Sequence, residues 1–294
     1  MREKMNTLFE YQKAFSRNIG WVTADEQNLL RSRKIAIAGL GGVGGSHLLT
    51  LTRLGIGAFH IADFDKFELA NFNRQAGATV SHLDNEKTEV LAAMAKDINP
   101  ELEIKKFSTG VTKQNLDDFF SEVDVYVDAL DFFAFDARQM VFDYCAKNNI
   151  PAITAAPLGM GAALLNFLPG RMSFEDYFQL EGKSEMDKIL NFLLGLAPSM
   201  LQRGYLVYPG AVDLFNHKGP STPMACELCA GLATTQVLKI LLKRGKVLSA
   251  PWGLHFDAYS NKLVKTWRPG GNSNPLQRLA INLARRQFMS QQSK

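Results

Sequence analysis

Short apolar runs alternate with amphipathic stretches through the first half of the chain. The run Lys34–Leu40 is almost entirely apolar and ends in glycines, which is typical of a buried parallel strand. A helix is expected over Val43–Leu54, and strands and helices continue in alternation. The further strands are expected over Ala58–Asp65, Leu102–Phe107, Val123–Leu130 and Ile150–Ala155, and the further helices over Glu86–Ile98 and Phe135–Lys147. This β-α order predicts an α/β fold with a doubly wound, Rossmann-like, mostly parallel sheet.

The second half of the chain is less regular. A strand over Ala162–Phe167 and a hairpin of Leu254–Tyr259 with Leu263–Trp267 are expected to extend the sheet with antiparallel strands. Helices are expected over Ser184–Leu194 and from Pro223 to about Lys243, with a Gly- and Pro-rich loop between them. We therefore divide the chain into an N-terminal helical arm (1–32), a main domain (33–270) with a nucleotide-binding part at about 33–160 and a second part at about 161–270, and a basic C-terminal tail helix (271–294).

Composition places the chain among ordinary globular proteins. It has 294 residues, of which 46% are hydrophobic and 21% charged, a balance that excludes disordered and fibrous classes. No uninterrupted apolar run reaches the roughly 18 to 20 residues that cross a bilayer, and the N-terminus lacks the apolar core of a secretory signal. Three cysteines are too few for a disulfide framework. These features predict a cytoplasmic protein without a membrane span.

The formal net charge of +4 is unevenly distributed. Residues 258–294 hold seven Lys and Arg and no Asp or Glu, which leaves 26 basic against 29 acidic residues in the rest of the chain. The basic surplus is therefore a property of the C-terminal segment. That segment is either a solubilising appendage or a docking place for an acidic carrier protein or RNA.

A glycine-rich turn follows the first predicted strand and opens the first predicted helix. Glycines in such a turn let the backbone approach a phosphate, and the helix N-terminus offers unpaired N–H groups and a favourable dipole. Asp63, at the end of the next strand, stands where an acid commonly holds a ribose hydroxyl. The turn alone is compatible with a plain tight turn or with an NAD site, and no Walker-type GK[ST] follows it. The glycines concerned are Gly39, Gly41, Gly42 and Gly44.

Four further segments make the pattern more specific. Asp63–Gln75 reads DFDKFELANFNRQ, Lys87 opens a helix, and Asp131 closes the string DALD after the fourth strand. Phe15–Ile19, FSRNI, precedes them all. With the glycine turn, these segments resemble the ThiF/MoeB/HesA family of ubiquitin-activating-enzyme-like adenylyltransferases. The resemblance covers about residues 11–160 and, more weakly, 225–267.

The resemblance implies a reaction in which a carboxylate attacks the α-phosphate of ATP, giving an acyl-adenylate and pyrophosphate. It assigns the phosphates to Arg74 and Lys87, the ribose to Asp63, and Mg²⁺ to Asp131, a carboxylate suited to a hard cation. Asp65 and Asn71 would line the nucleotide pocket. Arg17 would reach the phosphates of a second copy across a homodimer interface. No general base is needed, because the attacking carboxylate is already ionised.

Each assignment has a plainer alternative. In the plainer alternatives, Arg74 and Lys87 are surface cations without a ligand, and Asp131 caps the helix that follows it. Lys87 lies in a first helical turn, where the dipole disfavours a cation, so we expect it to face an anion. Arg138 matches an arginine that the family often carries, or else is a solvated charge.

The cysteines separate this chain from many relatives. Those relatives hold a structural zinc with two CxxC pairs, whereas this chain has only Cys226 and Cys229 at that spacing, so zinc is not expected. The pair lies early in a helix, where a thiol pKa is lowered and the thiol can act as a nucleophile. The alternative is that both thiols are buried in the core.

The stretch 172–219 departs from sulfur-carrier-activating relatives and leaves the acceptor open. Its aromatic string Phe174–Phe178 either grips a peptide or packs internally. The leading interpretation is an ATP- and Mg²⁺-dependent adenylyltransferase for the C-terminal glycine of a ubiquitin-like or sulfur-carrier protein, or for a peptide. The alternatives are a tRNA-modifying dehydratase of the same family, with RNA on the basic tail, and an NAD-dependent oxidoreductase.

Overall fold

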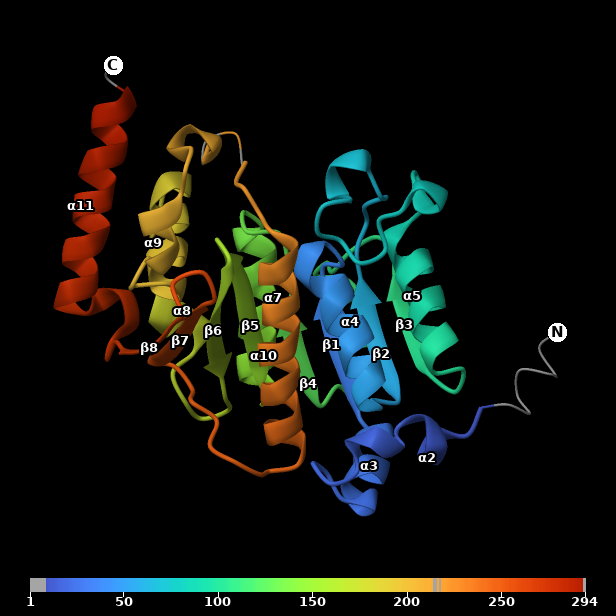
Figure 1. Ribbon diagram of the computed structural model, residues 1–294. Coiled ribbons are helices and arrows are strands. Elements are labelled where there is room, and N and C mark those ends of the chain that lie inside the picture. Colours follow the sequence, from blue (N-terminus) through green and yellow to red (C-terminus); the bar gives the residue numbers. More distant parts are fainter. Residues whose placement is uncertain (1–8, 214–215, 217, 293–294) are drawn as a thin grey trace. The chain divides into compact units, whose positions relative to one another are not determined.

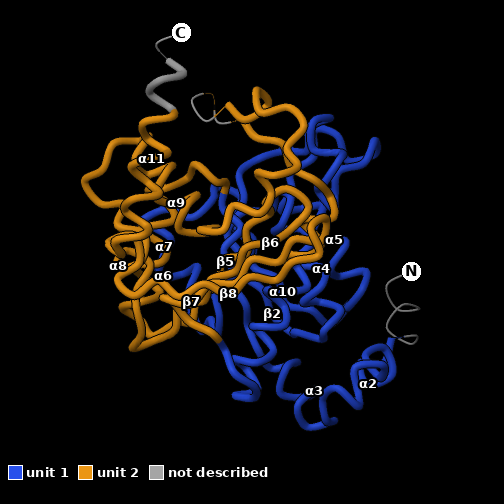
Figure 2. Tube along the Cα trace, turned by 60° about the vertical axis from the view of Figure 1, so that its left-hand side comes forward, with its two compact units in different colours: residues 1–130, 230–247 blue, residues 131–229, 248–294 orange. Residues whose placement is uncertain are grey.

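The chain forms two compact structural units, each made of two segments of the sequence (Figure 2). Unit 1 comprises residues 1–130 and 230–247, and unit 2 comprises residues 131–229 and 248–294. The computed structural model describes residues 9–213, 216 and 218–292, with side chains as far as residue 287. The units cut across the expected domain limits at residues 160 and 270, which stay a prediction.

Unit 1 is built on a parallel sheet with the strand order β3-β2-β1-β4 (Figure 1). Ile35 on β1 stands opposite Phe59 on β2 and Val125 on β4, and all three side chains are fully buried. A strand covered on both faces requires such a continuous apolar run. The strands are β1 (Lys34–Ala38), β2 (Ala58–Ala62), β3 (Glu103–Phe107) and β4 (Val125–Asp128). Strands β2 and β3 are added on one side of β1, and β4 is added on its other side. In such folds, ligands bind at the carboxyl ends of the strands where the strand order reverses in this way, here between β1 and β4.

Helices connect these strands and form the N-terminal arm. The arm is fixed to the unit by Tyr11, whose hydroxyl donates to the carbonyl of Gly55 at 2.5 Å, and by Asn18, whose amide donates to the Leu54 carbonyl at 3.2 Å. Thr23 and Glu26 close a capping box at the start of α3. The helices are α2 (Tyr11–Ala14), α3 (Ala24–Arg31), α4 (Gly42–Leu54), α5 (Lys87–Ile98) and α6 (Leu116–Phe119), with short 3₁₀ turns η1 (Ser16–Asn18), η2 (Leu69–Asn71) and η3 (Val80–His82).

Unit 2 is built on antiparallel strands in the order β5-β6-β7-β8. Strand β6 is buried along its whole length and lies between β5 and β7, with Leu165 opposite Thr154 and Gly253. The strands are β5 (Ala152–Leu158), β6 (Gly161–Phe167), β7 (Trp252–Asp257) and β8 (Lys262–Trp267). The expected fold class is confirmed: a Rossmann-like parallel sheet with antiparallel strands in the C-terminal half.

The basic C-terminal helix is an integral part of unit 2. Gln277 donates to the Leu194 carbonyl at 2.7 Å, Ile281 is 5% exposed, and Arg285 pairs with Asp187 at 2.7 Å. Removing the helix would expose the apolar face of α9, so it is more than an appendage. The helices of unit 2 are α7 (Phe135–Lys147), α8 (Phe174–Phe178), α9 (Glu185–Leu196) and α11 (Pro275–Gln292), with 3₁₀ turns η4 (Leu201–Tyr205), η5 (Pro209–Ala211) and η6 (Gly271–Ser273).

The aromatic string at 174–178 forms the short helix α8, which the hydrophobic pattern did not predict. Ser173 caps it by accepting a hydrogen bond from the Asp176 amide at 3.1 Å. Phe174, Tyr177 and Phe178 are at most 2% exposed. The string therefore packs internally, and the alternative in which it grips a peptide is not supported.

Helix α10 (Pro223–Leu241) begins in unit 2 and ends in unit 1. Among the described residues it is the one helix that is long and apolar enough to cross a membrane, and 44% of its apolar window is buried. Core helices pass the same test, and Cys229, Ala233 and Val237 are all inaccessible to solvent. The helix itself was expected from Pro223 to about Lys243, which the structure confirms. Its apolar window did not register as an uninterrupted apolar run because Glu227 and Lys239 interrupt it.

Candidate functional site

The glycine turn between β1 and α4 folds back on itself and on the chain that leaves β4. Gly39 has φ +88°, and a Cβ there would lie 2.1 Å from the Ala129 carbonyl oxygen. A Cβ at Gly44 would lie 2.0 Å from the Gly39 carbonyl oxygen. At Gly41 the nearest atom would be the Gln75 amide nitrogen at 3.8 Å. Gly39 and Gly44 are thus required by packing, whereas the space beside Gly41 leaves its backbone approachable by a ligand.

Asp63 fixes this turn to the end of β2. One carboxylate oxygen accepts a hydrogen bond from the Leu40 amide at 2.6 Å, and the other accepts one from the Asp65 amide at 2.8 Å. The pKa of the Asp63 carboxyl is raised, because the effect of burial exceeds the opposing effects of the Lys87 charge and the two amide hydrogen bonds. Each carboxylate oxygen has a second lone pair, so the group retains acceptor capacity for a hydroxyl.

Lys87 is a buried cation at the first position of α5. Its side chain is 6% exposed, and its ammonium donates to Asp65 at 3.0 Å, while the Lys87 amide donates to the Asp65 carbonyl at 3.1 Å. The Asp65 side chain remains 54% exposed. This carboxylate explains how a lysine is tolerated in a first helical turn. The pair places a cation and an anion next to Asp63 in one unit.

The turn after Asp65 carries the remaining residues of the DFDKFELANFNRQ string. The Asn71 side chain accepts from the Glu68 amide at 3.0 Å and so closes η2. The Arg74 guanidinium donates to the Ala70 carbonyl at 3.1 Å and to the Asn73 side chain at 2.9 Å. Asn71 therefore serves the local turn, and the Arg74 side chain is held against the same turn.

Gln75 is a candidate site residue to which the sequence interpretation gave no role. It is 7% exposed, and its carbonyl oxygen Oε1 has no hydrogen-bond partner among the described residues. Its amide nitrogen faces the open side of Gly41. Its place directly after Arg74 in the motif string was the available signal. A buried amide with an unused acceptor next to the glycine turn is suited to a polar ligand.

Arg17 lies in η1 of the N-terminal arm and is exposed. The neighbouring Phe15 and Asn18 anchor the arm, whereas Arg17 makes no hydrogen bond or ion pair within the described ranges 9–213, 216 and 218–292. Its guanidinium is therefore presented outward from unit 1. The expected contact of Arg17 with the phosphates of a second copy stays a prediction.

Asp131 is the first residue of unit 2, and it is exposed. Its carboxylate accepts a hydrogen bond from the Phe133 amide at 2.9 Å. No group of three or more His, Cys, Asp or Glu gathers to hold a metal in the described part of the chain. A single exposed carboxylate nevertheless fits Mg²⁺, which commonly binds one or two carboxylates and completes its shell with substrate phosphates and water.

Cys226 and Cys229 of α10 are both inaccessible to solvent. Burial raises the pKa of the Cys229 thiol well above its usual range, and the nearby Cys226 raises it further. The thiolate form of Cys229 is therefore disfavoured. This differs from the expected lowering of the pKa near a helix N-terminus, because desolvation outweighs the effect of the helix dipole. The geometry favours the packing alternative for both cysteines.

Comparison with known proteins places these features in context. Residues 15–279 match the model of the ThiF family. The chain is 31% identical over 148 residues to the sulfur carrier protein ThiS adenylyltransferase of Escherichia coli strain K12, covering 50% of this chain and 58% of the relative. It is 32% identical over 150 residues to the tRNA threonylcarbamoyladenosine dehydratase of Bacillus subtilis strain 168, covering 51% and 57%. The matches thus span a little over half the length of these curated relatives.

A solved structure supports the fold over more of the chain. Escherichia coli MccB with MccA-N7isoASN superimposes with a TM-score of 0.67 at 20% identity, covering 88% of this chain and 72% of MccB. At that identity the likeness concerns the fold alone.

Proposed function

The chain belongs to the ThiF family, and from this membership we propose that it is an ATP-dependent adenylyltransferase that converts a carboxylate into an acyl-adenylate with release of pyrophosphate. The observation that carries the proposal is the group of contacts in unit 1: Asp63 holds the Leu40 amide of the glycine turn, and the buried Lys87 stands on Asp65 beside it. Burying an ammonium costs desolvation free energy, so a lysine at this position favours a role beyond closing the turn. ATP bound at the glycine turn would require cations beside it to neutralise the negative charge of the triphosphate.

The proposed mechanism distributes the charge of ATP over this chain's own groups. The backbone at Gly41 and Gly42 receives phosphate oxygens, and Lys87 and Arg74 neutralise the charge that develops on the α-phosphate and on leaving pyrophosphate. Asp63 accepts from a ribose hydroxyl with its remaining lone pairs. Arg17 of a second copy would supply another cation.

Asp131 is the residue proposed to hold Mg²⁺. When bound, this ion would neutralise phosphate charge and orient the triphosphate for in-line attack. The carboxylate that attacks is already ionised, so the chain needs to align it and not to deprotonate it.

The proposed substrate is the C-terminal glycine of a ubiquitin-like or sulfur-carrier protein, or the end of a peptide. The relative named ThiS adenylyltransferase supports a carrier protein, and the solved structure of the fold neighbour MccB with MccA-N7isoASN keeps a different kind of partner among the candidates. We further propose a cytoplasmic homodimer.

A tRNA-modifying dehydratase is the second candidate. It is favoured by the 32% identity to a tRNA threonylcarbamoyladenosine dehydratase and by the acid-free segment 258–294 with its exposed Arg278 and Arg286. Binding of tRNA through these cations would weaken steeply with salt. The double variant Arg278→Glu/Arg286→Glu should then abolish tRNA binding and leave ATP binding intact.

ATP–pyrophosphate exchange tests the leading proposal. Exchange that requires Mg²⁺ and a carrier or peptide with a free C-terminal carboxylate, and that is lost in Lys87→Met and Asp131→Asn, is expected. A thermal shift with NAD and none with ATP and Mg²⁺ would instead favour the oxidoreductase alternative and exclude the adenylyltransferase.

A further inference from the structure

Arg138 on α7 is a buried cation that the proposed mechanism leaves unused. It is 2% exposed, so the alternative of a solvated surface charge is wrong. Its Nη2 donates to the Asp131 carbonyl at 2.9 Å, and its Nη1 donates to the Phe132 carbonyl at 3.2 Å. One guanidinium therefore holds two successive carbonyls of the turn that begins with the proposed magnesium ligand.

The turn itself is closed by local hydrogen bonds. The Ala134 amide donates to the Asp131 carbonyl at 3.0 Å, and the Phe133 amide donates to the Asp131 carboxylate at 2.9 Å. The direction of the Asp131 side chain is thus tied to the backbone that Arg138 holds. Without Arg138, the two carbonyls would lose charge-assisted donors, and the turn could change its conformation.

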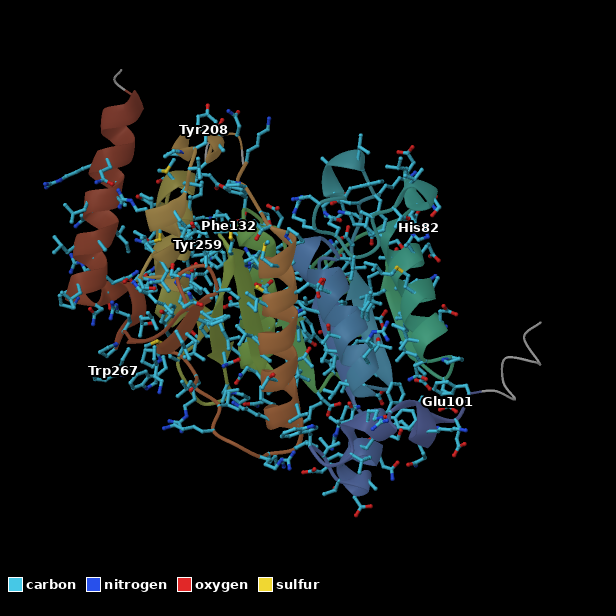
Figure 3. The ribbon with its side chains drawn as sticks, in the orientation of Figure 1. His82, Glu101, Phe132, Tyr208, Tyr259 and Trp267 are labelled. Carbon is cyan, nitrogen blue, oxygen red and sulfur yellow. The ribbon has the colours of Figure 1, made fainter. Side chains whose placement is uncertain are left out.

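An aromatic ring on α9 fixes the plane of the guanidinium. The Arg138 Cζ lies 4.6 Å from the centroid of the Phe192 ring, which also lies 5.2 Å from Phe132, labelled in Figure 3, and 5.7 Å from Phe135. A cation above an aromatic face in a buried place is stabilised electrostatically. Phe192 thus touches Arg138 and the turn that Arg138 holds.

Other side chains of α7 join it to α8 and α9 through polar contacts of their own. Lys188 on α9 pairs with Asp136 at 2.7 Å, and Gln139 donates to Glu175 on α8 at 3.0 Å. The Lys188–Asp136 pair offers a matched control, since Asp136 is 91% exposed and the pair links the same two helices.

We propose that Arg138 is a positioning residue: stacked on Phe192, it holds the Asp131–Phe132 backbone so that the Asp131 carboxylate is oriented for a divalent cation. The inference rests on the proposed function, in which Asp131 binds Mg²⁺. It also gives Phe192 on α9 a role in that orientation.

The first measurement uses the ligand-free protein and needs no activity. Hydrogen exchange of a peptide covering residues 131–135 should be at least about fivefold faster in Arg138→Met and Arg138→Lys, because the carbonyls lose their fork of donors. Phe192→Leu should show a smaller increase of the same kind. Lys188→Ala should exchange like the wild type.

The second measurement follows the cation. Calorimetric titration of ATP at increasing Mg²⁺ should give an apparent Mg²⁺ constant about tenfold or more weaker in both Arg138 variants, as is typical when a support of a metal ligand is removed. ATP binding without Mg²⁺ should be unchanged. If Arg138→Met does not fold, Arg138→Lys carries both measurements.

Two results would overturn the inference. One is wild-type exchange and Mg²⁺ dependence in both Arg138 variants, and the other is an equal effect of Lys188→Ala, which would show general helix packing. The variant Asp131→Asn tests the underlying assignment of Asp131 as the Mg²⁺ ligand separately from the positioning role of Arg138. If that variant keeps the wild-type Mg²⁺ constant, the assignment of Asp131 as ligand fails, and the positioning role fails with it even where exchange of the turn is faster.

Discussion

The carboxylate of Asp63 accepts a hydrogen bond from the backbone amide of Leu40 at 2.6 Å. This contact joins the end of β2 to the glycine turn that follows β1. It fixes the turn before any ligand is bound, because a partly buried carboxylate and a backbone donor form one of the stronger hydrogen bonds in a protein. Preorganisation of this kind lowers the cost of binding a phosphate at the turn.

The glycines of this turn should respond differently to alanine. Gly39→Ala places a Cβ 2.1 Å from the Ala129 carbonyl oxygen at φ +88°, so we expect a loss of more than about 3 kcal/mol in the free energy of unfolding. Gly41→Ala meets its nearest atom at 3.8 Å and should fold normally. Its Cβ should nevertheless obstruct a phosphate and weaken ATP binding about tenfold or more.

Urea unfolding and calorimetry with ATP check this pair of glycine variants. Equal stability of the two variants would contradict the packing argument. Normal ATP affinity in Gly41→Ala would mean that phosphate does not approach the turn there.

The positions of the candidate residues could be predicted from the sequence better than their contacts. Asp63 was expected at the end of the second strand and lies directly after it, because an apolar run that ends in an acid marks a strand end. Its bonds to the Leu40 and Asp65 amides depend on how the turn folds back, which no periodicity encodes. Lys87 was expected to face an anion, and its partner is Asp65.

Burial accounts for what the sequence could not provide. Arg138 was compatible with a solvated charge until Phe192, more than 50 residues later, was found against it. Helix α8 has five residues, too few for a helical period to emerge, and its aromatic residues are buried by tertiary packing. The early-helix position of Cys229 suggested a reactive thiol, whereas desolvation decides its pKa.

Alkylation tests the assignment of the two cysteines. At pH 7 the native protein should react with iodoacetamide at Cys226 and Cys229 at least about 100-fold more slowly than the urea-unfolded protein, because both thiols are buried and only a thiolate attacks. The double variant Cys226→Ala/Cys229→Ala should retain ATP–pyrophosphate exchange. Rapid labelling of the folded chain, or loss of exchange with an unchanged melting temperature, would restore a thiol to the mechanism.

His47 on α4 should make stability depend on pH. Its ring is fully buried with both nitrogens unpartnered among the described residues, and burial lowers its pKa to about 3. The unfolded chain, with a histidine pKa of about 6.5, therefore binds more protons than the folded one below that pH. The contribution of neutral His47 to the free energy of unfolding is fully present above about pH 6.5 and decreases as the pH falls. At pH 5 this one group has lowered the free energy of unfolding by about 2 kcal/mol.

Urea unfolding at pH 7, 6 and 5 measures this effect of His47. His47→Leu should be at least as stable as the wild type at pH 7, because it removes unpartnered buried nitrogens. Its loss of stability toward pH 5 should be smaller by about 2 kcal/mol, although His60 and His255, whose pKa values are also lowered by burial, keep part of the dependence. The same pH dependence in both proteins would contradict the argument.

Variants of Lys87 and Asp65 should distinguish a role of this ion pair in catalysis from a role in stability. Lys87→Met keeps the volume of the buried stem and leaves the 54% exposed Asp65 to water, so its unfolding free energy should fall by less than about 1 kcal/mol. Pyrophosphate exchange should fall about 100-fold or more, because a cation at the phosphates is lost. Asp65→Asn leaves the 6% exposed ammonium without its carboxylate, so it should cost more stability than Lys87→Met, about 1 to 3 kcal/mol. If instead Lys87→Met lost the stability and kept the exchange, the lysine would be a structural partner of Asp65 and would have no role in holding ATP.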